Sequence, residues 1–136
     1  MDFNRLIRTN IPDLAQVYGG ARGRTMSSRH QSYAWPALVE SGITQVIDLR
    51  KADSSEKLPR LCDKYKIEYF HYPVDNDKET IVKMVELMPE LCKRIDKGNF
   101  YIACAMGLHR TDITLCVYWV SYGADRGIEP PILRGY

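Results

Sequence analysis

Short runs of apolar, β-branched and aromatic residues alternate along this chain with segments whose apolar residues recur at helical spacing. The first pattern is typical of buried strands and the second of helices. Strands that alternate with helices favour parallel pairing through crossover connections. The sequence therefore predicts the α/β class, with a central, mostly parallel sheet flanked by helices. Strands are expected within 15–24, 44–50, 67–74 and 100–104, and helices within 35–42, 54–66, 80–97 and 111–123.

The longest predicted helix runs from Thr80 until Gly98 and Asn99 end it. Pro89 should kink or divide this helix, because proline lacks the N–H that a helix interior needs. The segment 111–123 is apolar nearly all round, which predicts a helix at the centre of the domain. The apolar face expected in the longest helix comprises Ile81, Val82, Val85, Met88, Leu91, Cys92 and Ile95.

Length and charge limit what the chain can be. Its 136 residues suit a single domain, 1–136. A net charge of +2 is too weak to indicate a nucleic-acid partner, for which clustered Lys and Arg would be expected. No apolar run approaches the roughly 20 residues that span a bilayer, and the polar start is no secretory signal. We therefore expect a cytoplasmic protein without a nucleic-acid or membrane partner, and the sequence does not indicate its oligomeric state.

The four cysteines are scattered, with neither a C-x-x-C pair nor a metal-binding Cys/His spacing, so no disulfide framework and no metal site are expected. Three of them fall on apolar helix faces and are predicted to be buried: Cys62, Cys92 and Cys116. A protective disulfide between Cys62 and Cys104 is the less favoured alternative. Cys104 differs, because it ends a predicted strand.

The segment Cys104-Ala-Met-Gly-Leu-His-Arg-Thr111 joins that strand to a helix. Such a loop directs several backbone N–H groups at one point beside the positive end of a helix dipole, which favours an anion and a cysteine thiolate. Arg110 can hold two phosphate oxygens in a bidentate fork, and Thr111 can place a hydroxyl beside the thiolate. The residues predicted to bind phosphate are Ala105, Met106, Gly107, Leu108, His109 and Arg110.

These residues resemble the H-C-x5-R-S/T signature of the protein tyrosine and dual-specificity phosphatase superfamily. The order of VYGGAR, GITQVIDLR, YFHYPVDND and IACAMGLHRT extends the resemblance over most of the chain. It implies the cysteine-phosphatase fold, a phosphocysteine intermediate at Cys104, no cofactor, and a phosphorylated protein or small phosphorylated molecule as substrate. The G-x-H-R-T portion also looks like an atypical branch that acts on phosphoproteins or inositol pyrophosphates. Relatives usually continue with further helices, so the rear of the domain is expected to be minimal, truncated or completed by a partner.

Two positions depart from this family pattern. Ala103 replaces the histidine that helps hold the thiolate, which predicts weaker activity and leaves open a catalytically weak phosphate-binding module. Asp112 stands where many members have glycine. A carboxylate is favourable at a helix N-terminus, but here it is expected near the anion, where it would narrow substrate choice.

The resemblance also implies an aspartate on an upstream loop as general acid. Both Asp75 and Asp77 in PVDND qualify. Asp77 is well placed to cap the helix that follows, so Asp75 is slightly favoured as the acid.

Other polar residues near the predicted site have more than one interpretation each. Asp48 and Arg50 should form a structural ion pair, with substrate contact as the alternative. His109 could orient the loop, contact substrate or be solvated. Three arginines near the early glycine-rich turn could attract an anionic substrate or form a solvated surface, and these are Arg22, Arg24 and Arg29.

Overall fold

In the part of the chain that the structure describes, five strands form one sheet in the order β1-β2-β5-β3-β4, with β5 at its centre. A computed structural model describes residues 1–26, 34–51 and 57–135 of the chain, so Arg29 lies outside the described residues. All pairings except β1 with β2 are parallel, which confirms the predicted α/β class and mostly parallel sheet. The strands are β1 Ala15–Val17, β2 Gly20–Arg22, β3 Gln45–Asp48, β4 Glu68–His71 and β5 Phe100–Ala103.

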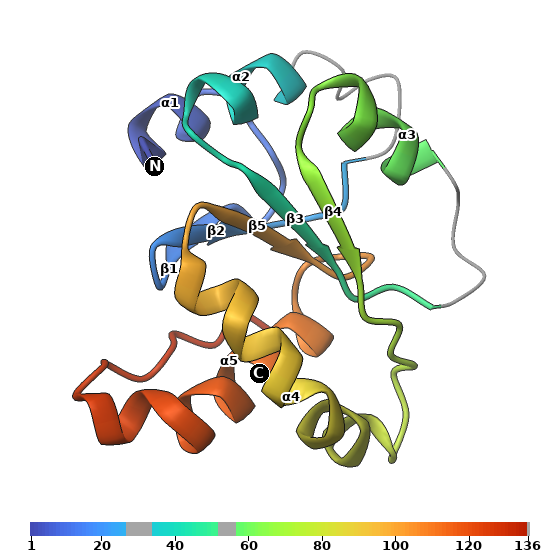
Figure 1. Cartoon of the computed structure of the whole chain (residues 1–136), viewed down its shortest axis with the longest axis vertical. Coiled ribbons are helices and arrows are strands. Elements are labelled where there is room, and N and C mark those ends of the chain that lie inside the picture. Colours follow the sequence, from blue (N-terminus) through green and yellow to red (C-terminus); the bar gives the residue numbers. More distant parts are fainter. Residues whose placement is uncertain (27–33, 52–56, 136) are drawn as a thin grey trace.

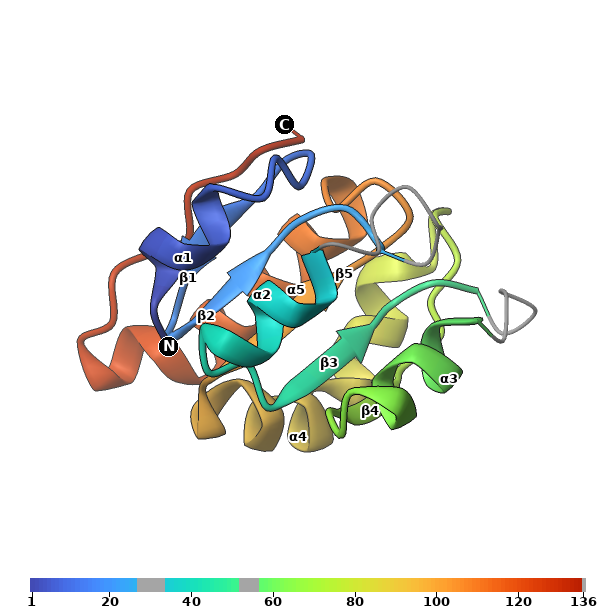
Figure 2. The same cartoon turned by 90° about the horizontal axis from the view of Figure 1, so that it is seen from above.

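Helices cover both faces of the sheet (Figures 1 and 2). Three short helices pack on one face, and α4 with α5 pack on the other. The chain turns through a π-helical segment after α5 and then a short 3-10 turn. The helices are α1 Phe3–Ile7, α2 Ala34–Glu40, α3 Lys57–Lys64, α4 Thr80–Lys97, α5 His109–Tyr118, η2 Trp119–Gly123 and η3 Ala124–Arg126.

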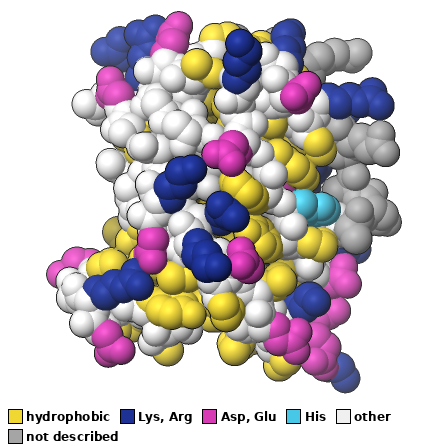
Figure 3. Space-filling view, viewed as in Figure 1, with side chains coloured by type: hydrophobic (Ala, Val, Ile, Leu, Met, Phe, Trp, Pro, Cys, Tyr) yellow, Lys and Arg dark blue, Asp and Glu magenta, His cyan; other side chains and the backbone are white. Residues whose placement is uncertain are grey.

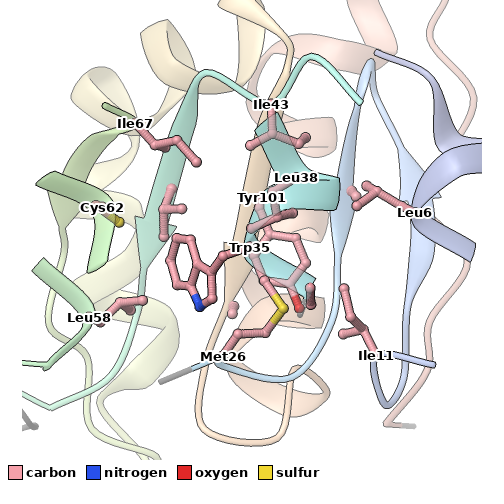
Figure 4. Packing of buried hydrophobic residues seen from close by; sticks show 14 residues of the cluster. Leu6, Ile11, Met26, Trp35, Leu38, Ile43, Leu58, Cys62, Ile67 and Tyr101 are labelled. Atoms are coloured by element: carbon pink, nitrogen blue, oxygen red, sulfur yellow. The ribbon is translucent and has the colours of Figure 1, made fainter. Parts of the chain in front are cut away.

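Each face of the sheet has its own apolar core. Trp35 of α2 is fully buried on one face, where it packs near Met26, Leu38 and Tyr101 (Figure 4). On the other face, side chains of α4 pack against β5 and against Tyr118 of α5. Every residue of β3 and β5 is buried, as expected for strands covered by helices on both sides. This double burial fixes the end of β5, where Cys104 follows.

Several local predictions need correction. The segment 15–24 contains two strands rather than one, because Tyr18 and Gly19 adopt positive φ and turn the chain back on itself. The short helix α1 carried too weak an apolar pattern to be predicted. Helix α4 continues through Pro89, so the proline does not divide the helix, which was one of the two predicted outcomes. The carbonyl that loses its partner there belongs to Val85, which is exposed and can be hydrated.

The predicted apolar face of α4 is only partly buried. Met84, Met88, Leu91, Cys92 and Ile95 are buried, whereas Ile81, Val82 and Val85 are more than half exposed. In Figure 3, hydrophobic side chains form patches on this face of the molecule, the most extended of them in its lower part, with charges of both signs between them. Cys62 and Cys92 are buried as predicted, but Cys116 is partly exposed. Within the described ranges, no helix combines the length and apolarity needed to cross a bilayer.

Candidate active site

Cys104 lies directly after the central strand β5, at the edge of the sheet where the parallel strands end. Ala103, the last residue of β5, pairs with Asp48 at the end of β3, and its carbonyl accepts a hydrogen bond of 2.9 Å from Leu49 N–H. Residues 104–108 then have no regular secondary structure, and α5 begins at His109; the segment 104–110, which includes the first two residues of α5, is called the Cys104 loop below. The predicted strand–loop–helix arrangement is therefore present. Ligand sites in open α/β sheets form at this edge.

The loop bends sharply at Gly107, which has a φ of 74°. A side chain there would also strike the backbone of Gly23 and Arg24, so the position excludes a Cβ on two grounds. On the same side, the Thr25 hydroxyl donates a hydrogen bond of 2.7 Å to the Cys104 carbonyl. The segment 23–25 thus supports the loop from behind, a role that was not predicted from the sequence.

The Cys104 thiol is almost wholly buried, with 3% of the residue exposed. Burial works against ionisation. The pKa of Cys104 nevertheless lies below its ordinary value, because neighbouring groups that favour the thiolate outweigh the effect of burial. These groups are the hydroxyl and N–H of Thr111, the charge of Arg110 and the N–H of Gly107. The Thr111 hydroxyl lies 3.3 Å from the sulfur and donates to it. These groups stabilise a thiolate although Ala103 replaces the family histidine.

Arg110 lies on the first turn of α5, and its Nη1 donates a hydrogen bond of 2.9 Å to the carbonyl of Val74. This contact links the Cys104 loop to the 74–79 segment. Ala105 and Met106 on the loop are exposed, Leu108 is half-buried, and Gly107 is buried. The loop therefore opens to solvent at 105–106 while its base is packed.

The two aspartates predicted as acid candidates both line a hollow of about 160 Å³ with Pro73, Thr80 and Lys83. The Asp77 carboxylate accepts a hydrogen bond of 2.8 Å from the N–H of Glu79, just before α4. Asp77 therefore supports the start of the helix, although Glu79 rather than Asp77 occupies the N-cap position. Asp75 follows Val74, the residue that Arg110 contacts, and its carbonyl accepts a hydrogen bond from the Thr80 hydroxyl over 2.6 Å.

Asp48 and Arg50 form the expected buried ion pair. Arg50 Nε and Nη2 lie 3.0 and 3.1 Å from the two carboxylate oxygens, and the Tyr69 hydroxyl donates to the same carboxylate over 2.6 Å. Burial opposes ionisation of this carboxyl, but the hydrogen bonds from Arg50 and Tyr69 lower the pKa of Asp48 below its usual value. Burial, with a smaller contribution from Asp48, raises the pKa of the nearby Cys62 to about 12, which fits an inert packing thiol.

Both alternatives predicted for Arg22, attraction of an anionic substrate and a solvated surface position, were wrong. Arg22 is neither a substrate-attracting surface residue nor a solvated one, because only 1% of it is exposed. Its Nη2 lies 2.6 Å from Asp112 and donates to the carbonyls of Gly107 and Leu108 over 3.0 and 3.1 Å. Arg24 remains partly exposed and lies 3.4 Å from Asp13. A charged residue within a three-residue buried strand signals a partner, but only the fold identifies it as Asp112.

The expectation that Asp112 would act near the anion also needs correction. Its carboxylate pairs with Arg22 and accepts hydrogen bonds from the N–H groups of Arg134 and Gly135. These partners lie on β2 and the C-terminal segment, so the Asp112 carboxylate has a structural role. His109 is exposed and packs against Gly135. Among the described residues, no group of three or more Cys, His, Asp or Glu side chains could hold a metal ion.

No protein-family model and no curated protein sequence matches this chain. Its fold does match solved structures. A DUF442 protein from Shewanella putrefaciens CN-32 superposes with a TM-score of 0.67 at 19% identity, over 91% of this chain and 80% of that one. The catalytic core of the PP-IP phosphatase Siw14 from S. cerevisiae, solved with citrate, gives a TM-score of 0.62 at 13% identity, over 85% and 68%.

A third solved structure, TpbA from P. aeruginosa in complex with phosphotyrosine, gives a TM-score of 0.61 at 13% identity, over 79% of this chain and 62% of that one. At these identities the likeness is one of fold. The chain has the fold of the cysteine-dependent protein tyrosine and dual-specificity phosphatases, as the sequence resemblance implied.

Proposed function

We propose that this chain is a cysteine-dependent phosphatase, which hydrolyses phosphate monoesters through a phosphocysteine intermediate at Cys104. One observation carries the proposal. A buried thiol with a lowered pKa accepts a hydrogen bond from Thr111 at the mouth of a strand-to-helix loop that ends in Arg110. A packing cysteine would have no need of these thiolate-stabilising groups. The chemistry uses the protein's own side chains and requires no metal or organic cofactor.

In the first step, the Cys104 thiolate attacks phosphorus in line with the ester oxygen. The S–P bond forms and the P–O bond to the leaving group breaks. The N–H groups of the loop 105–110 and the Arg110 guanidinium stabilise the charge on the three equatorial oxygens. The hydrogen bond from Arg110 to Val74 uses one guanidinium nitrogen, so the remaining N–H groups are the ones that bind phosphate oxygens.

The leaving oxygen takes its proton from a carboxylic acid, and we propose Asp75 for this role. The Asp77 carboxylate already accepts the Glu79 N–H, whereas Asp75 is the neighbour of the residue that Arg110 contacts. Both residues line one hollow, so Asp77 is the alternative. In the second step, the same carboxylate removes a proton from water, which attacks phosphorus and breaks the S–P bond. Thr111 donates its hydrogen bond to the departing Cys104 thiolate.

The proposed substrate is a phosphotyrosine or dual-specificity phosphoprotein. Support comes from the likeness in fold to TpbA, which was solved with phosphotyrosine bound. An inositol phosphate or pyrophosphate is the second candidate, favoured by the likeness to the PP-IP phosphatase Siw14. To distinguish these substrates, we would compare the turnover rates of one protein preparation with a phosphotyrosine peptide, with phosphoinositides and with an inositol pyrophosphate.

The competing function is a catalytically weak phosphate-binding module, and the observation in its favour is Ala103 in place of the family histidine. The test is Cys104→Ser with p-nitrophenyl phosphate as substrate. We expect turnover below a few per cent of wild type, with binding of inorganic phosphate retained. A serine variant with substantial turnover would assign the nucleophile elsewhere. A wild-type protein that binds phosphate without turnover would establish the binding module instead.

A further inference from the structure

A buried ion pair joins strand β2 to the first turn of α5 beneath the candidate active-site loop. Arg22 Nη2 lies 2.6 Å from the Asp112 carboxylate, and the two side chains are only 2% and 1% exposed. The same nitrogen donates to the carbonyls of Gly107 and Leu108. One guanidinium thus contacts two carbonyls of the loop and a carboxylate of the helix that follows it.

These contacts determine how two loop peptides are oriented. In a planar trans peptide, the C=O and the N–H of the next residue point in opposite directions. Arg22 holds the Gly107 carbonyl on its own side, and it shares the Leu108 carbonyl with the N–H of Asp112, so the N–H groups of Leu108 and His109 face the other way. A carbonyl turned into the loop would instead repel an anion. Arg22 therefore favours the peptide orientation that an anion-binding loop needs.

Stability alone does not account for this pair. Replacing a buried ion pair by apolar side chains of similar volume often leaves a protein equally stable. In the described part of the chain, Nε and Nη1 of Arg22 are buried without a hydrogen-bond partner, which adds to the desolvation penalty. Arg22 is therefore better explained by its effect on the orientation of the loop peptides than by a contribution to stability.

The C-terminal segment completes the arrangement. The Asp112 carboxylate accepts hydrogen bonds from Arg134 N–H at 3.0 and 3.1 Å and from Gly135 N–H at 2.7 Å. Gly135 also packs closely against His109 and Leu108, so the segment contacts the loop directly. The segment therefore fixes the carboxylate that in turn orients Arg22.

We infer that Arg22 and Asp112 are positioning residues, which hold the 104–110 loop in its anion-binding conformation, and that the backbone of Arg134 and Gly135 completes this support. The inference rests on the proposed function, because it concerns the same loop. It assigns to β2 and the C-terminal segment a role in anion affinity without any contact to the substrate.

The primary test compares wild type with Arg22→Met and with the double variant Arg22→Met/Asp112→Leu, in which both buried charges are removed together. Inorganic phosphate is the probe. Its affinity is measured by how it slows iodoacetamide alkylation of Cys104, which mass spectrometry of the peptide detects. We expect phosphate affinity to fall at least tenfold in both variants, with kcat also reduced and the pH midpoint of Cys104 alkylation raised. The double variant is expected to keep a cooperative thermal transition.

The role of the C-terminal segment is tested by Arg134→Pro, with Arg134→Ala as its matched control. Proline removes the N–H that Asp112 accepts, whereas alanine removes only the side chain. We expect phosphate affinity to fall at least threefold in the proline variant and to stay at the wild-type value in the alanine variant. Arg126→Ala, which removes an exposed ion pair with Asp96, serves as a second control and should leave phosphate affinity unchanged.

The outcomes separate the inference from the proposed function. If phosphate fails to protect Cys104 in the wild-type protein, the proposed function is wrong. If phosphate protects the wild type and protects the folded double variant equally well, with the same pH midpoint, the positioning role is wrong. Equal affinity in Arg134→Pro and Arg134→Ala would overturn the contribution of the C-terminal segment.

Discussion

Arg110 and Val74 are joined by a hydrogen bond of 2.9 Å from the guanidinium Nη1 to the backbone carbonyl. The contact ties the end of the Cys104 loop to the segment that carries both acid candidates. A guanidinium is planar and rigid, so the nitrogen fixed by Val74 also fixes the direction of the others. The hydrogen bond therefore orients the face of Arg110 that would meet a phosphate.

Arg110→Lys should lose most activity although the positive charge is retained. A lysine ammonium cannot contact Val74 and two phosphate oxygens in one plane. We expect kcat/KM for p-nitrophenyl phosphate to fall by about two orders of magnitude, corresponding to roughly 2.7 kcal/mol of transition-state stabilisation. Wild-type kinetics in the lysine variant would show that Arg110 is not the phosphate clamp.

Substrates with different leaving groups distinguish the two candidates for the general acid, Asp75 and Asp77. Loss of a general acid typically costs about 10²–10⁴ in rate, and the loss is largest where the leaving oxygen is basic. Asp75→Asn should therefore slow phosphoserine hydrolysis far more than p-nitrophenyl phosphate hydrolysis and flatten one limb of the pH–rate profile. Asp77→Asn should reduce stability by about 1 kcal/mol or less and leave the leaving-group dependence unchanged. The reverse pattern assigns the acid to Asp77.

The pH dependence of alkylation tests the state of Cys104. Its pKa is lower than that of an ordinary thiol, so the reactive thiolate persists as the pH falls and disappears only below that lowered value. Alkylation of Cys104 should accordingly begin at a lower pH than alkylation of Cys116, whose pKa is raised by burial and by Asp112. Thr111→Val removes the hydroxyl donor and should raise the Cys104 midpoint by about one pH unit, since a hydrogen bond to a charged group contributes roughly 1.5–3 kcal/mol. An unchanged midpoint would rule out the Thr111 contribution.

Two glycines with nearly equal φ but different surroundings allow a test of how closely the Cys104 loop is packed. Gly107 and Gly127 have φ values of 74° and 72°, but a Cβ at Gly107 would strike the backbone at Gly23 and Arg24, whereas a Cβ at Gly127 meets nothing within 4 Å. Gly127→Ala should therefore cost only the strain of the left-handed conformation, about 1–2 kcal/mol. Gly107→Ala should cost more stability and weaken phosphate binding at least tenfold. Equal melting temperatures and equal phosphate affinities in the two variants would show that the packing at Gly107 is not critical.

What the sequence predicted well is local. The strand that ends at Ala103, the loop that follows it and the helix beginning at His109 are adjacent in the chain, so periodicity and turn chemistry are enough to place Cys104, Gly107 and Arg110 together. The ending of α4 at Gly98 follows from the same kind of signal, since Gly98 has a φ of 72°.

What the sequence could not predict depends on segments far apart in the chain. Helical spacing shows that Ile81 and Val85 share a face with Met88, but not whether another element covers that part of the helix. Similarly, nothing near Arg22 in the sequence indicates that its partner is Asp112, because only the pairing of β2 with β5 brings them together. The site's catalytic residues are thus local in sequence, while their structural support is not.

The central position of β5 has a consequence for how the molecule assembles. β5 pairs with both β2 and β3, yet it comes last in chain order among the five described strands. Until it arrives, the hairpin β1–β2 and the pair β3–β4 have no strand between them. The Arg22 contact with Gly107 spans 85 residues, and such long-range closures slow folding. The contacts that hold the candidate active-site loop therefore depend on the same strand that joins the two halves of the sheet.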